Sequence, residues 1–217
     1  MFELDVELFF ELFKGRGDVF AERWESFYDP QKVGYSPICI KRSGECPRPY
    51  SFCKNCPDKH YKPFTPKDIE QHLLGNKTYP LVNGRYCPFV VIDLDEDDCR
   101  NDAKAILECA EKFGIPAYLE ISRSGKGIHI WIFFEGLVSA KDARLLCDSL
   151  ITLTQNQIRM EVSLSSFDRI IPCQDVLDTN QLGNLVALPL QKKRRPNASV
   201  FVDKNLQKKA SGFPTRE

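Results

Sequence analysis

The stretch "VVIDLDEDD" at residues 90–98 holds the carboxylates with the clearest capacity for chemistry in this chain. Side chains on a strand alternate between two faces, so Asp93 and Asp95 share one face. Two carboxylates held this close repel each other unless a cation lies between them, and hard oxygen ligands suit Mg²⁺ or Mn²⁺. An EF-hand calcium loop starting at Asp93 is excluded, because Asp98 would replace the turn glycine and Lys104 the closing glutamate. An acidic loop that caps the following helix is the simpler alternative.

The stretch "SRSGKGIHIWIFF" at residues 122–134 is a small, basic, glycine-rich turn that leads into an apolar strand. Backbone amides from Ser124 to Gly127 could hold phosphate oxygens, and Arg123 or Lys126 could add positive charge. This is not a Walker loop, because a glycine follows the lysine. The strand histidine alone would fit a satisfied core residue, but its place after this turn makes it a candidate triphosphate contact. The candidate nucleotide-binding residues are Ser122, Arg123, Ser124, Gly125, Lys126, Gly127 and His129.

A further pair of acids follows in "SSFDRIIPCQD" at residues 165–175. Either Asp168 or Asp175 could complete a site in which three carboxylates hold two metal ions. Each acid alone would fit an ordinary loop, and the sequence leaves the choice between them open. The candidate catalytic residues are therefore the pair Asp93 and Asp95 with one of these two.

Four of the nine cysteines are grouped in one segment, "CIKRSGECPRPYSFCKNC". Cys39, Cys46, Cys53 and Cys56 lie there in a stretch that has no core pattern of its own. Four thiolates fit tetrahedral Zn²⁺ and leave no position for water, so we expect a structural zinc site, with His60 as a substitute ligand. Two disulfides are the alternative. The other five cysteines, Cys87, Cys99, Cys109, Cys147 and Cys173, are scattered as thiols are in a reducing compartment.

These residues need a scaffold, and the hydrophobic pattern predicts strands alternating with helices, as in an α/β or α+β core. Helices are expected at 2–13, 18–27, 65–75, 99–113 and 140–154, and strands at 86–93, 117–122, 127–134, 159–164 and 184–190. Thr65, Pro66 and Gly75 delimit the third helix, Gly114 ends the fourth, and Ser139 caps the fifth. We place a division near residue 80, between a helical, cysteine-bearing unit at 1–80 and the core at 81–217.

Composition bounds the class of protein. The 217 residues, 42% hydrophobic and 28% charged, predict one or two packed domains rather than a disordered chain. No apolar run reaches about eighteen residues and the N-terminus is acidic, which predicts a cytoplasmic protein without a membrane span or export signal. The net charge is zero, yet the first residues are mostly acidic and the last mostly basic. The basic end at 191–209 fits either a solvated, partly disordered tail or a phosphate-contacting surface.

Together these motifs resemble the archaeo-eukaryotic primase superfamily, which has a DxD strand, a Ser-x-x-x-x-His turn and strand, and a third acid before a final apolar strand. The closer resemblance is to the primase-polymerase domain of TOTE conflict systems and of CRISPR-associated primase-polymerases. It covers nearly all of residues 14–203. Its motifs are "GRGDVFAERW", the cysteine cluster, "CPFVVIDLD", "SRSGKGIHIWIFF", "FDRIIPCQD" and "GNLVALPLQ".

The resemblance implies a two-lobed α+β primase fold with a catalytic lobe like an RNA-recognition motif and an added zinc module. It implies a DNA primase-polymerase, a template-dependent nucleotidyltransferase that makes or extends primers from dNTPs or NTPs with two metal ions. Asp93 and Asp95 carry over as metal ligands, Ser124 and His129 as triphosphate contacts, and Asp168 as the third acid. Asp175, however, lies nearer the final strand. The chain ends soon after the basic stretch, as an excised domain would.

The implied partners are single-stranded or primed DNA or RNA and, beyond these, helicases, nucleases or CRISPR adaptation proteins, with no membrane. Basic residues would line the template groove beside the aromatic His129 face, namely Arg169, Lys192, Lys193, Arg194 and Arg195. Two other classes stay open: a catalytically inactive single-stranded nucleic-acid-binding module and a metal-dependent nuclease. The intact DxD pair and His129 argue against the first, and the presence of only three histidines argues against the second.

Overall fold

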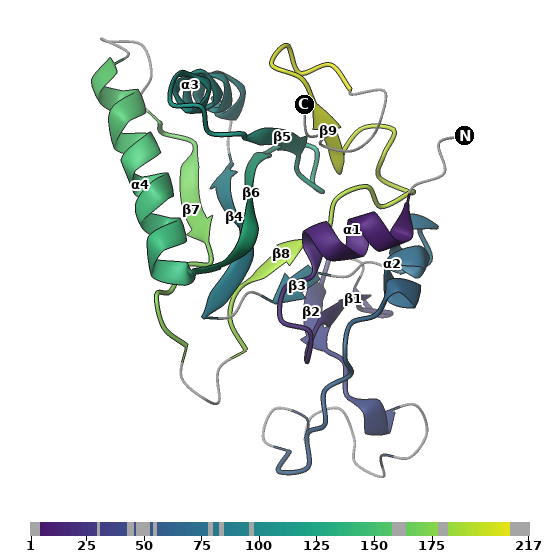
Figure 1. The fold of residues 1–217 in the computed structure, drawn as a ribbon. Helices are drawn as coiled ribbons and strands as arrows, with labels where there is room; N and C mark the ends of the chain where they lie inside the picture. Colours follow the sequence, from purple (N-terminus) through teal and green to yellow (C-terminus); the bar gives the residue numbers. More distant parts are fainter. Residues whose placement is uncertain are drawn as a thin grey trace.

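The computed structural model describes residues 5–29, 31–42, 46, 53, 56–77, 80–82, 85–95, 98–157, 164–177 and 182–208. They form a mixed α/β structure with antiparallel sheets (Figure 1). The elements are α1 (Val6–Phe13), β1 (Ala21–Glu25), β2 (Val33–Pro37), the 3₁₀ helix η1 (Ile40–Arg42), α2 (Pro66–Leu73), β3 (Pro80–Val82), β4 (Tyr86–Leu94), α3 (Cys99–Lys112), β5 (Tyr118–Ile121), β6 (Ile128–Ser139), α4 (Ala140–Gln157), β7 (Phe167–Ile171), β8 (Leu185–Ala187) and β9 (Val200–Val202). The largest sheet has the order β7-β4-β6-β5-β9, and two-stranded sheets join β1 with β2 and β3 with β8.

The main sheet is built from the continuous unit β4-α3-β5-β6-α4-β7, to which β9 is added at the β5 edge. The first and third strands of this unit, β4 and β6, are neighbours in its centre. This βαββαβ connectivity is that of ferredoxin-like sheets, and RNA-recognition motifs also present a four-stranded sheet. The main sheet is therefore the counterpart of the expected catalytic lobe, while the two-lobed arrangement and the division near residue 80 stay predictions.

The two faces of this sheet are covered differently, because side chains alternate along each strand. Val90, Ile92 and Leu94 of β4 are fully buried, and each pairs with a buried isoleucine of β6. On the other face, Phe89 and Asp93 pair with Phe133 and His129. Helices α3 and α4 lie on one side of the sheet and α1 lies on the other (Figure 1). One side is thus a helix-covered core, and the other is apolar at one end and polar at the other.

Helix α1 closes the apolar end of the second face with aromatic rings. Its Phe13 is fully buried, with its ring centroid 5.2 Å from that of Trp131 and 5.3 Å from that of Phe133, both edge to face. Edge-to-face packing of this kind contributes beyond the buried area itself. The helix begins after Asp5, whose Oδ1 accepts from the amides of Glu7 and Leu8 at 3.0 Å. The predicted helix is confirmed here, and its expected start at residues 2–4 lies outside the described part.

The other predicted helices, apart from the one at 18–27, are confirmed with small shifts at their ends. At α2, Thr65 and Asp68 form a capping box and Pro66 is the first helical residue. Gly75 follows α2 and Gly114 follows α3, both with positive φ, as a glycine after a helix end commonly has. Ser139 Oγ accepts from the Asp142 amide at 3.1 Å at the start of α4. None of the helices within the described residues has both the length and the apolar character required to cross a membrane.

The helix predicted at 18–27 is wrong, because residues 21–25 form strand β1, which pairs with β2. Apolar residues there have a helical spacing, yet Trp24 packs over Gly34 of the partner strand. A Cβ atom at Gly34 would lie 2.6 Å from the Trp24 ring, so only glycine fits under it. Arg23 and Glu25 form an ion pair two residues apart, which a strand allows and a helix does not. Pairing with β2 therefore overrides the local pattern.

The C-terminal region differs from one of the two alternatives given for its basic stretch, a solvated and partly disordered tail. Residues 200–202 form β9, whose side chains are buried at the β5 edge of the main sheet. The preceding turn is anchored, since Arg195 donates to the carbonyls of Leu190 and Leu73 at 2.6 Å. Of the predicted strands, 184–190 is confirmed only at β8, and 159–164 falls almost entirely outside the described residues. Strand β7, which carries Asp168, was not predicted.

The four grouped cysteines are thiols rather than disulfides, so the two-disulfide alternative is not what the structure contains. The segment that carries them is closed at its base, where Cys39 pairs with Tyr61 and Ile40 N donates to His60 O at 2.8 Å. Cys56 N donates to Cys53 O at 3.5 Å. Within the described part of the chain, the four sulfur atoms do not form a metal-sized cluster. The zinc site stays a prediction.

Candidate active site

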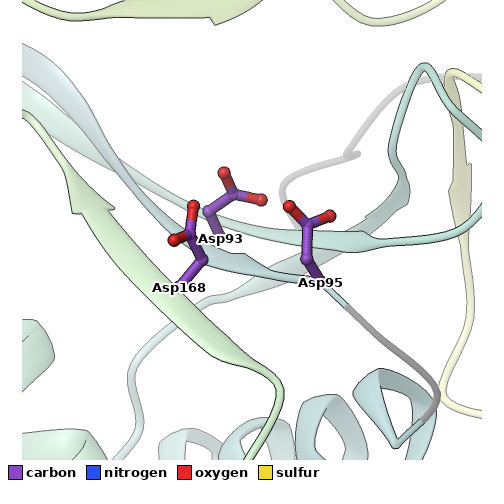
Figure 2. A group of neighbouring side chains, drawn as sticks. All are labelled: Asp93, Asp95 and Asp168. Carbon is purple, nitrogen blue, oxygen red and sulfur yellow. The ribbon is translucent and has the colours of Figure 1, made fainter.

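Three aspartates meet where β4 ends (Figure 2). Asp93 lies on β4, Asp95 follows the last residue of that strand, and Asp168 lies on the neighbouring strand β7. One carboxylate oxygen from each lies within 4.8 Å of the other two. Asp93 is partly buried and the other two are exposed, so the cluster opens to solvent. The structure thus brings the predicted DxD pair together with one of the two candidate third acids.

An irregularity in the pairing of β4 with β7 brings Asp168 into this cluster. Asp93 pairs with Arg169. The next residue of β4 pairs with Phe167, which leaves Asp168 as an extra residue between the two pairs. A bulge of this kind bends the strand and redirects the side chain of the extra residue. Regular alternation would have placed Asp168 and Arg169 on opposite faces.

The carboxylate cluster carries an excess of negative charge. Partial burial, together with the neighbouring charges of Asp93 and Asp168, raises the pKa of Asp95 above its usual value. Arg169 offsets part of this charge, since its Nε donates to Asp168 Oδ2 at 2.5 Å. That hydrogen bond in turn raises the pKa of Arg169. Because the ionised form of Asp95 is disfavoured here, a divalent cation bound among the three carboxylates would stabilise it.

His129 lies beside this cluster, held between two carboxylates. Its Nδ1 lies 2.9 Å from Glu120 Oε2, and its Nε2 lies 3.4 Å from Asp93 Oδ1. Burial alone would lower the pKa of His129, but the charges of Glu120 and Asp93 raise it to about 10. The same Glu120 oxygen accepts from Trp131 Nε1 at 2.7 Å. His129 is therefore an oriented imidazolium, and sequence analysis missed the buried carboxylate that orients it.

The glycine-rich turn approaches the carboxylates closely at Gly127. A Cβ atom there would lie 2.4 Å from Asp95 Oδ1, so a side chain has no room. Three of the four amides expected to hold phosphate, however, already donate within the turn. The acceptors are Ser122 O for Gly125, Ser124 Oγ for Lys126 and Ser122 Oγ for Gly127, at 2.9, 3.1 and 3.2 Å. Phosphate contacts from this turn would therefore come from side chains such as Lys126.

A buried acid on α3 supports the site from behind, and sequence analysis missed it as well. Asp102 Oδ2 accepts from the hydroxyl of Ser166 at 2.6 Å and from its amide at 3.2 Å. Ser166 O in turn accepts from the amide of Asp95 at 2.8 Å. This chain of hydrogen bonds fixes the ends of β4 and β7 relative to each other. The only sequence signal was an acid in the first turn of a helix, which is common.

The remaining predicted residues are distributed over different parts of the molecule. Asp175 is not part of the carboxylate cluster and forms an ion pair with Arg144 at 2.9 Å. Arg169 contacts Asp168, whereas Lys193 and Arg194 line a separate cavity together with Arg123. Lys192 is exposed, and Arg195 holds backbone carbonyls near the end of α2.

The donor set of the cluster fits hard divalent cations such as Mg²⁺ or Mn²⁺. Opposite oxygen ligands of an octahedral Mg²⁺ lie about 4.2 Å apart, twice the metal–oxygen distance of about 2.1 Å. The observed limit of 4.8 Å between the three oxygens is close to this value, and two of the carboxylates are exposed to solvent. Residues Asp93, Asp95 and Asp168 are therefore able to hold such an ion.

Comparisons with known proteins agree with this geometry. The family model described as "TOTE conflict system, Archaeo-Eukaryotic Primase domain" matches residues 4–213. Among solved structures, the chain is similar to the polymerase domain of Mycobacterium tuberculosis ligase D in complex with DNA, with a TM-score of 0.51 and 12% identity over 87% of this chain and 75% of that one. At this identity the likeness shows the fold alone. A search of curated proteins gives no match. By its family match, the chain belongs to the archaeo-eukaryotic primase domain family of TOTE conflict systems.

Proposed function

We propose that the chain is a template-dependent nucleotidyltransferase, a DNA primase-polymerase that makes or extends primers from nucleoside triphosphates. The observation that carries the proposal is the convergence of Asp93, Asp95 and Asp168 beside His129 at one end of the sheet. Family membership supports the same class of reaction. When bound, a pair of divalent ions would activate the attacking 3′ oxygen and neutralise the charge on the leaving pyrophosphate.

The chain's own residues have separate roles in this proposal. Asp93 and Asp95 hold the ions, and Asp168 completes the ligand set. His129, kept protonated and oriented by Glu120, donates a charge-assisted hydrogen bond to the β- or γ-phosphate. Lys126 and Ser124 contact the same phosphates from the turn. Arg169, which is paired with Asp168, is positioned to hold a phosphate of the primer or template strand near the site.

Extension of a labelled primer on a template, with Mg²⁺ or Mn²⁺ and either dNTPs or NTPs, tests the proposal. The expected result is metal-dependent lengthening of the primer. Template binding without lengthening would instead indicate an inactive binding module, and metal-dependent shortening of the primer would indicate a nuclease. Parallel reactions with dNTPs and NTPs, with and without a primer, reveal the preferred nucleotide and whether synthesis starts de novo.

We also propose that Cys39, Cys46, Cys53 and Cys56 bind one structural Zn²⁺, and that the four sulfur atoms come together as the ion binds. The proposal is supported by their occurrence as thiols and by the closed base of the segment at Cys39. Metal analysis of the purified protein should then find about one zinc per chain. Cys53→Ser should release the zinc and increase amide exchange in residues 35–60, while Cys109→Ser, at a buried cysteine of α3, should retain it. A zinc-free wild-type protein would contradict the proposal.

A further inference from the structure

A cavity lined by positively charged side chains lies between β1, the turn after α2 and the turn at residues 191–194. Its volume is about 500 Å³, within the range of ligand-binding cavities. Two of its cations are compensated, because Arg23 pairs with Glu25 and Lys77 pairs with Glu22. For the other three, Arg123, Lys193 and Arg194, no ion pair with a carboxylate occurs within the described residues. The cavity therefore has a net positive charge.

Two of the residues that line this cavity each have a buried polar atom without a hydrogen-bond partner. One is Arg123 Nε, and the other is Oε1 of Gln191, whose side chain is 3% exposed. The amide nitrogen of Gln191 is fully used, since it donates to the carbonyls of Gly75 and Lys77 at 3.3 and 3.4 Å. Buried polar groups are rarely left unpaired in a finished structure. The net positive charge of the cavity suits a ligand with anionic oxygens.

Exposed aromatic rings lie next to this cavity, at the tip of the β1–β2 hairpin. Phe27 and Tyr28 are each 94% exposed, and their ring centroids are 5.6 Å apart. Phe27 follows the cavity-lining Glu25 by two residues, at most about 7 Å of extended backbone. The tip itself is closed by hydrogen bonds, including Ser26 N to Lys32 O at 2.9 Å. The rings are therefore presented to solvent by an ordered turn.

We infer that this cavity and the hairpin tip together bind single-stranded nucleic acid. Arg123, Lys193 and Arg194 take the backbone phosphates, and Phe27 and Tyr28 stack on unpaired bases. Cations that follow a backbone, combined with aromatic rings that stack on bases, are the usual means of binding single strands without sequence preference. The inference rests on the proposed function in one respect, since the strand would be the template or primer of that reaction.

The cavity fits a strand better than it fits the incoming nucleotide. None of the described residues that line this cavity belongs to the aspartate cluster. A nucleotide must reach the aspartates with its phosphates, and one nucleotide cannot fill the cavity and also cover the hairpin tip. A strand of several nucleotides can do both.

Fluorescence anisotropy with a labelled single-stranded oligonucleotide that lacks terminal phosphates, in EDTA and without nucleotide, tests the inference. Phe27→Ala with Tyr28→Ala should weaken binding tenfold or more, because each stacked base contributes about 1–3 kcal/mol. Lys193→Ala with Arg194→Ala should weaken binding and reduce the salt slope by about 1.4, for two lost phosphate contacts. Matched controls on α3 and α4, Phe113→Ala and Lys112→Ala with Lys141→Ala, should bind as the wild type does.

Three results would overturn the inference: wild-type protein that does not bind the oligonucleotide, double variants that bind it unchanged, or a Lys193 and Arg194 variant that alters only the nucleotide KM. If the Phe27 and Tyr28 double variant lost as much affinity for duplex as for the single strand, the stacking of these rings on unpaired bases would be refuted. These outcomes are separate from those of the proposed function, because binding is measured without metal or nucleotide. Wild-type protein that binds the strand through these residues but does not extend primers would contradict the proposed function alone.

Discussion

One face of the main sheet is apolar at one end and polar at the other, although the same strands form both ends. Toward one end, Phe89 and Phe133 pair across β4 and β6, and Phe13 of α1 covers them. Toward the other end, Asp93 and His129 pair across the same two strands and remain uncovered by α1. Strand alternation selects the face in both cases. What differs is whether a helix supplies a partner surface, and this decides between a core and a site.

Trp131 lies between the two ends and belongs to both. Its ring is fully buried against Phe13, while its Nε1 donates to Glu120, the carboxylate that also binds His129. The apolar end thus provides a rigid support for the polar end. We expect changes at the apolar end to affect mainly stability and changes at the polar end to affect mainly nucleotide chemistry, and four variants test this expectation.

The largest effect should come from Asp93→Ala, which should abolish primer extension because one ligand of the two metal ions is lost. Stability should hold at neutral pH, because the variant loses both the repulsion between Asp93 and Asp95 and the attraction between Asp93 and the His129 imidazolium. Mg²⁺ should raise the melting temperature of the wild type but not of the variant. Asp175→Asn is the control and should retain extension. Near wild-type extension by the Asp93 variant would refute the metal site.

At the apolar end, Phe13→Ala should lower the free energy of unfolding by about 3–5 kcal/mol, because it leaves a cavity against Trp131 and Phe133. Urea denaturation measures this loss, and extension per folded molecule should change little. Leu8→Ala, at a half-exposed position of the same helix, is the matched control and should cost much less. If Phe13→Ala instead abolished extension in the folded fraction, the apolar and polar ends would not have separate effects on stability and on nucleotide chemistry.

At the polar end, His129→Ala should raise the nucleotide KM about ten- to a hundredfold, the equivalent of one charge-assisted hydrogen bond of about 1.5–3 kcal/mol. Affinity for the template should change little, because the residue faces Asp93 and Glu120 rather than the basic cavity. Steady-state kinetics and oligonucleotide binding separate the two quantities. A variant that melts earlier but has unchanged nucleotide affinity would identify His129 as structural.

The smallest effect should come from Glu120→Gln, which keeps the shape of the acceptor for His129 and Trp131 but removes its charge. The nucleotide KM should rise about three- to tenfold, since neutral hydrogen bonds are roughly half as strong as charged ones. The wild type should lose stability as pH rises from about 6.5 toward 10, because the pKa of His129 is raised to about 10 in the fold. The Glu120→Gln variant should lose less stability over that pH interval. Urea denaturation at the two ends of this interval measures the difference, and equal pH dependence would contradict the assigned coupling.

The sequence predicted those parts in which local pattern and tertiary structure agree. Strand β4 and helix α2 have clear alternation and capping residues, and Asp93 and Asp95 lie where alternation placed them. Strand β1 was missed because pairing with β2 and the packing of Trp24 on Gly34 override a helical spacing. Strand β9 was missed because its three residues follow a basic stretch and gain their burial only at the edge of the main sheet.

Within the site, the missed residues act through partners that are distant in sequence. Glu120 becomes significant only when β5 is paired with β6 in the register that places it opposite His129. Asp102 becomes significant only through Ser166, 64 residues away along the chain. The choice between Asp168 and Asp175 depended on the bulge in β7, which no propensity predicts. Sequence alone could therefore name candidate acids but could not select the set that converges.

Because of the bulge in β7, the position of the third carboxylate depends on the number of residues in this strand as well as on their identity. A deletion of Phe167 would restore regular pairing by placing Asp168 opposite Leu94, and the acid would then lie on the face away from Asp93, although every remaining residue type would be unchanged. In a related chain, an acid one position earlier or later could occupy the same place in space. The position of a gap within these few residues of a sequence alignment therefore determines whether a relative is judged to have the third metal ligand.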